Sequence, residues 1–157
     1  MRSFFHHTKA FSLLVLGTLL TILPSFISKP GGEGFEIYLN KKLVVQKFGG
    51  DIKNISTIEL DQAALNGELT VKYFHCGRVG KERHITIKNE QNKVLKTFRY
   101  PDGSSTNTAM LCRVNEIAGL QKATNNKQMK LYYSSTEIPD GRQLASLQIV
   151  SANTAKR

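Results

Sequence analysis

The segment Tyr73–Ile87, YFHCGRVGKERHITI, gathers the side chains best able to do chemistry in this chain. It contains His75, Cys76 and His84, and Cys112 is the second of the two cysteines. Thiolate and imidazole groups bind zinc when three or four of them surround one point. A thiolate beside an imidazole base is also the nucleophile of cysteine-dependent enzymes. The segment therefore raises two possibilities, a metal site and a reactive cysteine.

The alternation of side chains along a strand argues against both possibilities. In an extended strand His75 and Cys76 point to opposite faces, so one metal could bind both only where the strand ends, at Gly77. His75 and His84 could meet across the turn between them, but no third ligand follows at a standard spacing. The cysteines form no C-x-x-C motif. We therefore expect no metal and no cofactor, and we keep the His75/His84 pair as the one metal candidate.

The first 28 residues have the pattern of an export segment. Arg2 and Lys9 give a positive start, and residues 10–27 then run without a charge, which is the order found in secretory signal peptides. The apolar run also approaches the roughly 20 residues that span a bilayer, so an uncleaved membrane anchor is the alternative. Both interpretations place the following domain outside the cytoplasm, either secreted or periplasmic, or held at the inner membrane.

Export implies that the two cysteines pair. Proteins in an oxidising compartment ordinarily hold their cysteines as disulfides, so Cys76 and Cys112 are predicted to bond to each other. On the chain-entropy model, closing a loop of about 36 residues stabilises a domain by roughly 4 kcal/mol. The bridge would also remove the thiol that a cysteine nucleophile requires.

Residues 35–150 show the pattern of an all-β domain. Short runs in which apolar and polar residues alternate are separated by turn signals such as Pro139-Asp140-Gly141. The pattern predicts a single small antiparallel β-sandwich of seven or eight short strands. One short helical turn is expected within Val114–Leu120, ending near Gly119, because apolar residues recur there every three positions. Residues 29–34, KPGGEG, are typical of a flexible linker, and residues 151–157 of a disordered tail.

The net charge suggests an anionic partner. The chain carries 22 basic and 12 acidic residues, and excluding Arg2 and Lys9 of the export segment leaves a net charge of +8 (20 − 12). Basic proteins attract nucleic acids, acidic glycans and membrane surfaces. The basic residues are scattered rather than clustered in runs, and the chain is predicted to be exported, so we expect no nucleic-acid partner. An acidic polymer or another envelope protein fits better, with membrane association through residues 10–27 as an alternative.

Two neighbouring tyrosines suggest where a partner could bind. Tyr132 and Tyr133 must face opposite ways in a strand, so one belongs to the core and the other to the surface. The apolar alternation places Tyr133 inside, which leaves Tyr132 exposed on the same face as Lys130. Exposed tyrosine serves sugar and protein surfaces well. Tyr132 and Lys130 are therefore the candidate ligand face.

Motifs for catalysis are weak. No G-x-S-x-G elbow or phosphate-binding P-loop occurs, and the carboxylates of predicted loops form no specific pair; these are Asp102, Glu116, Glu137 and Asp140. We therefore expect not an enzyme but an exported, non-catalytic binding or structural module of the cell envelope, with its ligand unidentified. One alternative is a small extracytoplasmic hydrolase that uses loop carboxylates or His75/His84. Another is a membrane-anchored accessory subunit of an envelope complex.

Overall fold

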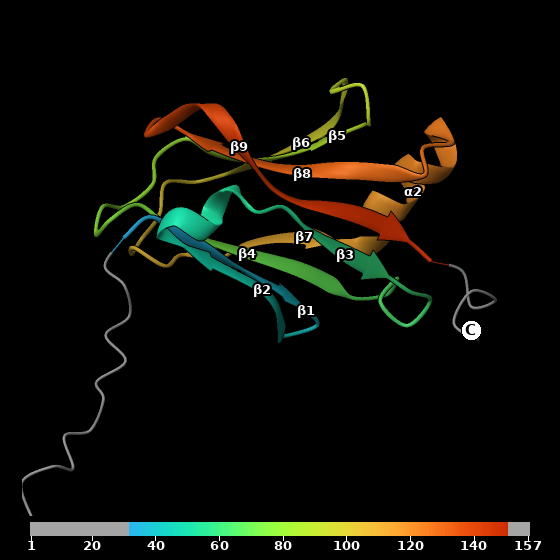
Figure 1. Ribbon diagram of the computed structural model, residues 1–157, viewed down its shortest axis with the longest axis horizontal. Helices are drawn as coiled ribbons and strands as arrows, with labels where there is room; N and C mark the ends of the chain where they lie inside the picture. Colours follow the sequence, from blue (N-terminus) through green and yellow to red (C-terminus); the bar gives the residue numbers. More distant parts are fainter. Residues whose placement is uncertain (1–31, 151–157) are drawn as a thin grey trace, which may run out of the picture.

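A computed structural model describes residues 32–150, which form two β-sheets lying on each other as a sandwich-like pair of layers (Figure 1). The expectation of an all-β domain with at most one α-helix is confirmed for these residues. The predicted export segment, residues 29–31 of the predicted linker and the predicted tail lie outside them. The described chain enters at one end of the sandwich and leaves at the other (Figure 1).

The first sheet has four strands in the order β2-β1-β4-β7, all antiparallel. Its strands are β1 (Gly34–Leu39), β2 (Lys42–Phe48), β4 (Glu68–Phe74) and β7 (Met110–Arg113). Alternation gives this sheet one apolar face, since Phe35 and Ile37 of β1 and Val71 of β4 are fully buried. The polar residues between them face solvent.

The second sheet has five strands in the order β3-β9-β8-β5-β6. Its strands are β3 (Ser56–Leu60), β9 (Ile138–Ile149), β8 (Gln128–Ser135), β5 (Arg83–Lys88) and β6 (Val94–Tyr100). Strands β3 and β9 pair in parallel, so the prediction of purely antiparallel sheets was wrong at this edge. The short 3-10 helix η1 (Gly49–Lys53) leads the chain from the first sheet to the second, where β3 runs in the same direction as β9. Within residues 32–150 nine strands form instead of seven or eight.

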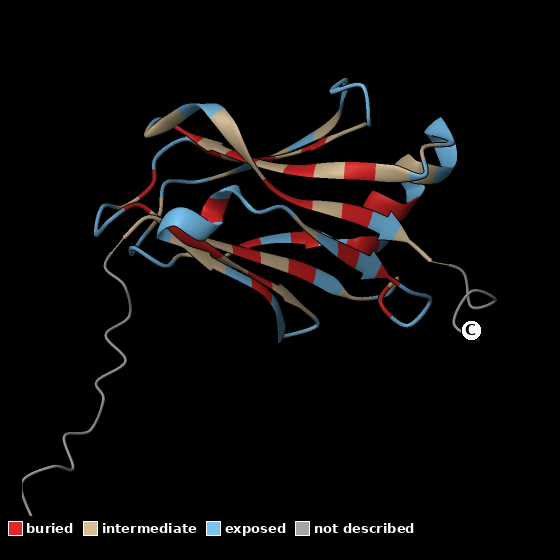
Figure 2. Ribbon diagram, viewed as in Figure 1, coloured by how far each residue is buried: buried red, intermediate tan, exposed pale blue. Residues whose placement is uncertain are grey.

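The core lies between the two sheets and consists of their inward-facing residues (Figure 2). Ile85 and Ile87 of β5 and Leu131 and Tyr133 of β8 are fully buried, and they face Phe35 and its neighbours in the first sheet. Burying one such side chain contributes roughly 1.5–3 kcal/mol relative to leaving it exposed. Burial of these apolar side chains therefore determines which face of each strand points inward.

The helix α2 (Val114–Thr124) is longer than the single turn predicted. Val114, Ile117 and Ala118 form its buried face, and it lies next to β7 at the end of the sandwich. Gly119 lies within the helix rather than at its end. The helix stops at Asn125, which adopts a left-handed conformation with φ of 50°, a common way to end a helix.

The predicted turn at Pro139–Gly141 lies instead within β9. The chain reverses two residues earlier, at Thr136 and Glu137, between β8 and β9. Gly141 has a φ of +72° and sits beside an irregularity in the pairing of the two strands. The positive φ of Gly141 therefore bends strand β9 and does not close a turn, because the pairing of β8 with β9 continues past this residue.

No helix within residues 32–150 is long and apolar enough to cross a membrane.

Candidate functional site

The predicted disulfide is contradicted, since Cys76 and Cys112 are both free thiols. In the register of β4 and β7, Cys112 lies opposite Leu69, and Cys76 follows Leu69 by seven positions along the chain. At about 3.3 Å per residue the two cysteines are roughly 20 Å apart, whereas a disulfide needs Cα atoms within about 7 Å. The prediction failed because it depended on which strands are neighbours and in which register.

The environments of the two thiols differ. Cys76 is exposed on the turn after β4 and adopts a φ of +51°. Cys112 is buried, and its Sγ lies 3.1 Å from the hydroxyl of Tyr100. Burial raises the pKa of the Cys112 thiol to about 11, so this thiol stays protonated and unreactive at neutral pH.

The structure does not bring His75 and His84 together. His75 follows β4, is 4% exposed and shares a hydrogen bond of 2.8 Å between its Nε2 and the Tyr133 hydroxyl. His84 lies on β5 opposite Ser134 of β8, and Ser134 points to the other face of the sheet from Tyr133. The two histidines therefore lie on opposite sides of the second sheet. The described residues contain no group of three side chains placed to hold a metal ion.

Tyr132 and Tyr133 point to opposite faces of the second sheet, as the alternation predicted. Tyr133 is fully buried, and Tyr132 is half-buried on the outer face of the second sheet. The ammonium group of Lys88, on the adjacent strand β5, lies 4.0 Å from the centre of the Tyr132 ring. A cation over the face of a tyrosine ring is attracted by its negative face. Lys88 therefore joins the two residues expected from the sequence.

Lys130 stands directly opposite Lys88 in the pairing of β5 and β8. Its ammonium group donates to the backbone oxygen of Glu90 at 3.0 Å and to Oδ1 of Asn92 at 2.7 Å. Among the described residues only Lys96–Glu116 and Arg142–Glu33 form ion pairs. Lys88 and Lys130 therefore lie side by side and form no ion pair; the carboxylate of Glu90 accepts instead from the backbone nitrogen of Gln128 at 3.1 Å.

Neutral polar side chains extend this surface across the sheet. The register places Thr86 of β5 beside Tyr132, and Gln143 of β9 on its other side. The Tyr132 hydroxyl donates to Gln143 Oε1 at 3.4 Å. We call this surface the lysine–tyrosine face; it comprises Thr86, Lys88, Lys130, Tyr132, Gln143 and Ser146.

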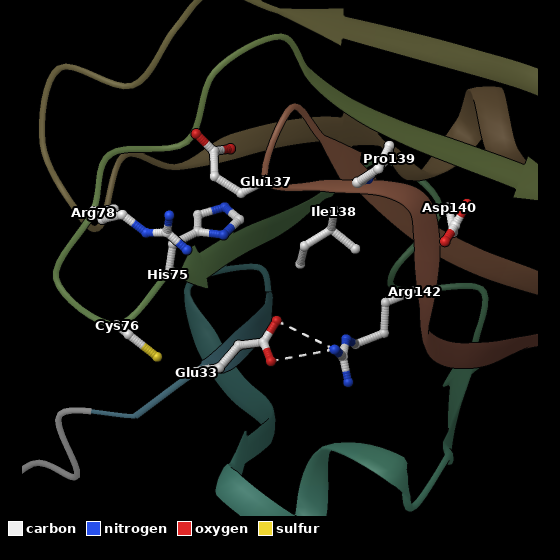
Figure 3. Close-up of a pocket in the computed structure, with 9 residues that line it drawn as sticks. All are labelled: Glu33, His75, Cys76, Arg78, Glu137, Ile138, Pro139, Asp140 and Arg142. Carbon is white, nitrogen blue, oxygen red and sulfur yellow. Dashed lines mark hydrogen bonds and ion pairs between the residues drawn. The ribbon is translucent and has the colours of Figure 1, made fainter.

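A second candidate is a hollow of about 400 Å³ at the end of the sandwich where the described chain enters (Figure 3). The turn after β4 and the beginning of β9 form its walls. Its charged lining residues are three carboxylates and two guanidinium groups, from Glu33, Glu137, Asp140, Arg78 and Arg142. The hollow, which we call the end pocket, therefore carries a formal charge of −1 on a chain of +10.

Glu33 and Arg142 form an ion pair at one side of the end pocket (Figure 3). One guanidinium nitrogen of Arg142 lies 3.2 Å from each oxygen of the Glu33 carboxylate. The hydroxyl of Tyr73 donates to the same carboxylate at 2.6 Å. Because both charged side chains are about one-third exposed, the pair contributes at most about 1 kcal/mol to stability. Its main effect is to fix the side chains in position.

Three aromatic rings lie beneath the end pocket and join the two sheets. The rings of Tyr73 and Tyr133 are stacked with centroids 4.3 Å apart, and the His75 ring lies 4.8 Å from that of Tyr73. Burial lowers the pKa of His75, although the carboxylates of Glu137 and Glu33 oppose this effect. Burial also raises the pKa of Tyr73 and Tyr133. All three rings are therefore neutral at neutral pH.

Gly80 is required at its position next to these rings. A Cβ atom at Gly80 would lie 2.9 Å from both His75 Nε2 and the Tyr133 hydroxyl. Any residue larger than glycine would therefore push apart His75 Nε2 and the Tyr133 hydroxyl, which share the hydrogen bond. The glycine in the predicted turn is explained by close packing rather than by a positive φ.

The sequence named only part of the end pocket. The sequence pattern indicates His75, Cys76, Glu137 and Asp140 as candidate chemical groups, but it places Glu33 in the linker and does not indicate Arg142. Arg142 lies opposite the buried Tyr133 in the strand register, so a basic residue at an inward-facing strand position was the available signal. Arg78 carries no such signal, because its place depends on how the turn after β4 folds.

Comparison of the sequence with models of known protein families and with curated proteins found no match.

Proposed function

We propose that the chain is an exported, non-catalytic binding module of the cell envelope, and that the lysine–tyrosine face binds an acidic polysaccharide. The observation that carries the proposal is the side-by-side placement of Lys88 and Lys130, neither of which forms an ion pair within the described residues. Uncompensated cations attract an anionic polymer. The amide and hydroxyl groups of Thr86, Gln143 and Ser146 are suited to hydrogen bonds with the hydroxyls of sugars.

The strand order supports a β-sandwich of the kind that often carries binding surfaces. Strands β4 and β7 are neighbours in one sheet, and β5, β8 and β9 are neighbours in the other. Immunoglobulin-like sandwiches place their B and E strands, and their C, F and G strands, in the same way. A fold alone does not determine function, so the binding proposal depends on the face and not on this likeness.

A small hydrolase is the second candidate, and one observation favours it. His75 lies in the same pocket as the carboxylates of Glu33 and Glu137, which is the combination that acid–base catalysis uses. Against it, Nε2 of His75 is already engaged by Tyr133, and His84 lies on the far side of the sheet. The further alternative of an anchored accessory subunit concerns residues 1–28, and the intact mass of the exported protein distinguishes it.

Binding to polygalacturonate, a polymer of uronic acid, tests the proposal. The double substitution Lys88→Gln and Lys130→Gln should weaken binding about tenfold, since exposed ionic contacts contribute roughly 0.2–1 kcal/mol each and 1.4 kcal/mol is a factor of ten. Added salt should weaken binding of the unsubstituted protein because it screens exposed charges. The dissociation constant is measured at two ionic strengths.

The matched control removes the same charge elsewhere. Lys41 and Lys42 lie at the turn between β1 and β2, on the other sheet, and Lys41→Gln with Lys42→Gln should leave the affinity nearly unchanged. Equal losses in both double variants would mean that net charge alone attracts the polymer. Polyglutamate in place of polygalacturonate distinguishes an acidic protein partner from a polysaccharide.

A further inference from the structure

We propose that the end pocket is a second binding site and takes a small zwitterion, such as a short peptide with free termini. In this arrangement Arg78 binds the carboxylate of the ligand and Asp140 binds its ammonium group. The inference does not depend on the lysine–tyrosine face, which lies on the outer surface of the second sheet. It rests on the mixed charge, the size and the shape of the pocket.

The end pocket contains both paired and unpaired charges. Arg142 and Glu33 are paired with each other, and Glu137 Oε2 accepts a hydrogen bond from the backbone nitrogen of Lys81 at 3.2 Å. Neither Arg78 nor Asp140 forms an ion pair with any residue in the described part of the chain. Glu137 likewise forms no ion pair but does accept that hydrogen bond, so Arg78 and Asp140 are the charged side chains of the pocket that have no polar partner within residues 32–150.

The two charges that have no polar partner lie far apart in the end pocket. Arg78 and Asp140 stand at opposite sides of the hollow, and the side chain of Ile138 lies between them (Figure 3). A ligand that spans the pocket would therefore meet a positive group, an apolar patch and a negative group in that order. A short peptide offers the complementary order, with a carboxylate at one end, an aliphatic body and an ammonium group at the other.

The lining of the end pocket disfavours ligands that carry only one sign of charge. Apart from the paired Glu33 and Arg142, a plain anion would face the carboxylates of Glu137 and Asp140, and a plain cation would face the guanidinium group of Arg78. Placing a like charge beside them costs free energy. The hollow of about 400 Å³ lies in the lower part of the range of roughly 300–1,000 Å³ that small-molecule sites occupy. A molecule with both charges and the size of a dipeptide meets these conditions.

The contacts of Arg142 are consistent with a preformed site. Its Nε atom is buried and has no hydrogen-bond partner among residues 32–150, although Glu33 holds the end of its guanidinium group. A buried donor without a partner is costly. A polar ligand, or the water that it displaces, would supply the missing acceptor.

The test uses the full-length exported protein and three forms of one dipeptide. Alanyl-leucine, its N-acetyl form and its C-terminal amide are each titrated, and the dissociation constant and the perturbed backbone amide signals are measured by NMR. We expect saturable binding of the free dipeptide, with changes at His75, Arg78 and Ile138. Removing either terminal charge should weaken binding about tenfold.

Two substitutions assign the ends of the ligand. Arg78→Gln should weaken binding of the free dipeptide about tenfold and have little further effect on the amide. Asp140→Asn should do the same and have little further effect on the N-acetyl form. The control substitutions Arg113→Gln and Glu68→Gln, at a paired position of β7 and β4, should leave binding unchanged.

Several results would overturn the inference. They are the absence of saturable binding, equal binding of the blocked and free dipeptides, or equal losses in the control variant. Cleavage of alanyl-leucine into its amino acids would instead contradict the non-catalytic part of the proposed function and leave the pocket as the binding site. Failure of polygalacturonate binding would affect the lysine–tyrosine face alone, so the two proposals can fail separately.

Discussion

Single residues in this chain are distinguished chiefly by which face of a strand they occupy. His75 and Cys76 are adjacent in sequence, yet His75 is buried against Tyr133 whereas Cys76 is exposed. The alternation that separates them could be predicted from the sequence, and so could the division between Tyr132 and Tyr133. The hydrogen-bond partner of each buried polar group could not be predicted, because His75 follows a strand of the first sheet whereas Tyr133 belongs to the second.

Exposure predicts unequal reactivity of the two cysteines. A maleimide should label Cys76 rapidly in the native protein and reach Cys112 only after unfolding, because Cys112 is 1% exposed and burial raises its pKa to about 11. Peptide mapping of the labelled protein identifies the modified residue. The mass of the monomer should be unchanged by reductant. A gain of two hydrogens on reduction would restore the Cys76–Cys112 disulfide and contradict the structure.

Burial of His75 predicts a dependence of stability on pH. Because burial lowers the pKa of His75 in the folded protein, the unfolded chain binds a proton more readily, and stability falls as pH drops through the unfolded value of about 6.5. The free energy of unfolding is measured by urea denaturation between pH 7.5 and 5.5 for the unsubstituted protein and for His75→Gln. The stability advantage of the unsubstituted protein should shrink toward pH 5.5. Parallel curves would rule out His75 as the cause.

At the scale of elements, a buried arginine holds the long loop between β6 and β7. Arg83 is 4% exposed; its Nε and Nη2 donate to the backbone oxygen of Pro101 at 3.0 and 2.9 Å, and its Nη1 donates to that of Thr108 at 2.8 Å. The planar guanidinium group therefore reaches both ends of the loop at once. No carboxylate is needed, because two carbonyl oxygens take up the donors.

Replacing Arg83 should loosen this loop. Arg83→Lys keeps the charge but cannot reproduce three directed hydrogen bonds, so we expect the free energy of unfolding to fall by roughly 2–4 kcal/mol. Hydrogen exchange of residues 101–108 should become faster. Arg99→Gln, on the exposed face of the neighbouring strand β6, serves as control and should change stability by less than about 0.5 kcal/mol. A lysine variant as stable as the original would mean that the loop is held by other contacts.

The elements themselves were partly predictable. Alternating runs such as Leu69–Tyr73 predicted strands correctly, since one buried face imposes a period of two. The turn at Pro139–Gly141 was misplaced because a proline and a glycine signal a change of backbone direction but do not distinguish a turn from a bent strand. The helix α2 was underestimated, because Gly119 suggested an end that packing of Ile117 and Ala118 overrides.

At the scale of the whole molecule, the two sheets separate two kinds of charged surface. The outer face of the second sheet carries Lys88 and Lys130, neither of which forms an ion pair within the described residues, whereas the end pocket is lined by more carboxylates than guanidinium groups. The net charge of the chain predicted an anionic partner in general terms. Where the charges gather depends on strand order and register, including the parallel pairing of β3 with β9, which the sequence does not encode locally.

The most direct measurement of the central claim is a map of backbone amide NMR signals during titration with polygalacturonate at low salt. The signals of Lys88, Lys130, Tyr132 and their neighbours on the outer face of the second sheet should shift together, and added salt should reverse the shifts. Signals of Lys41, Lys42 and the end pocket should remain in place. Shifts spread over all basic residues, or confined to the end pocket, would contradict the assignment of the lysine–tyrosine face as the polysaccharide-binding surface.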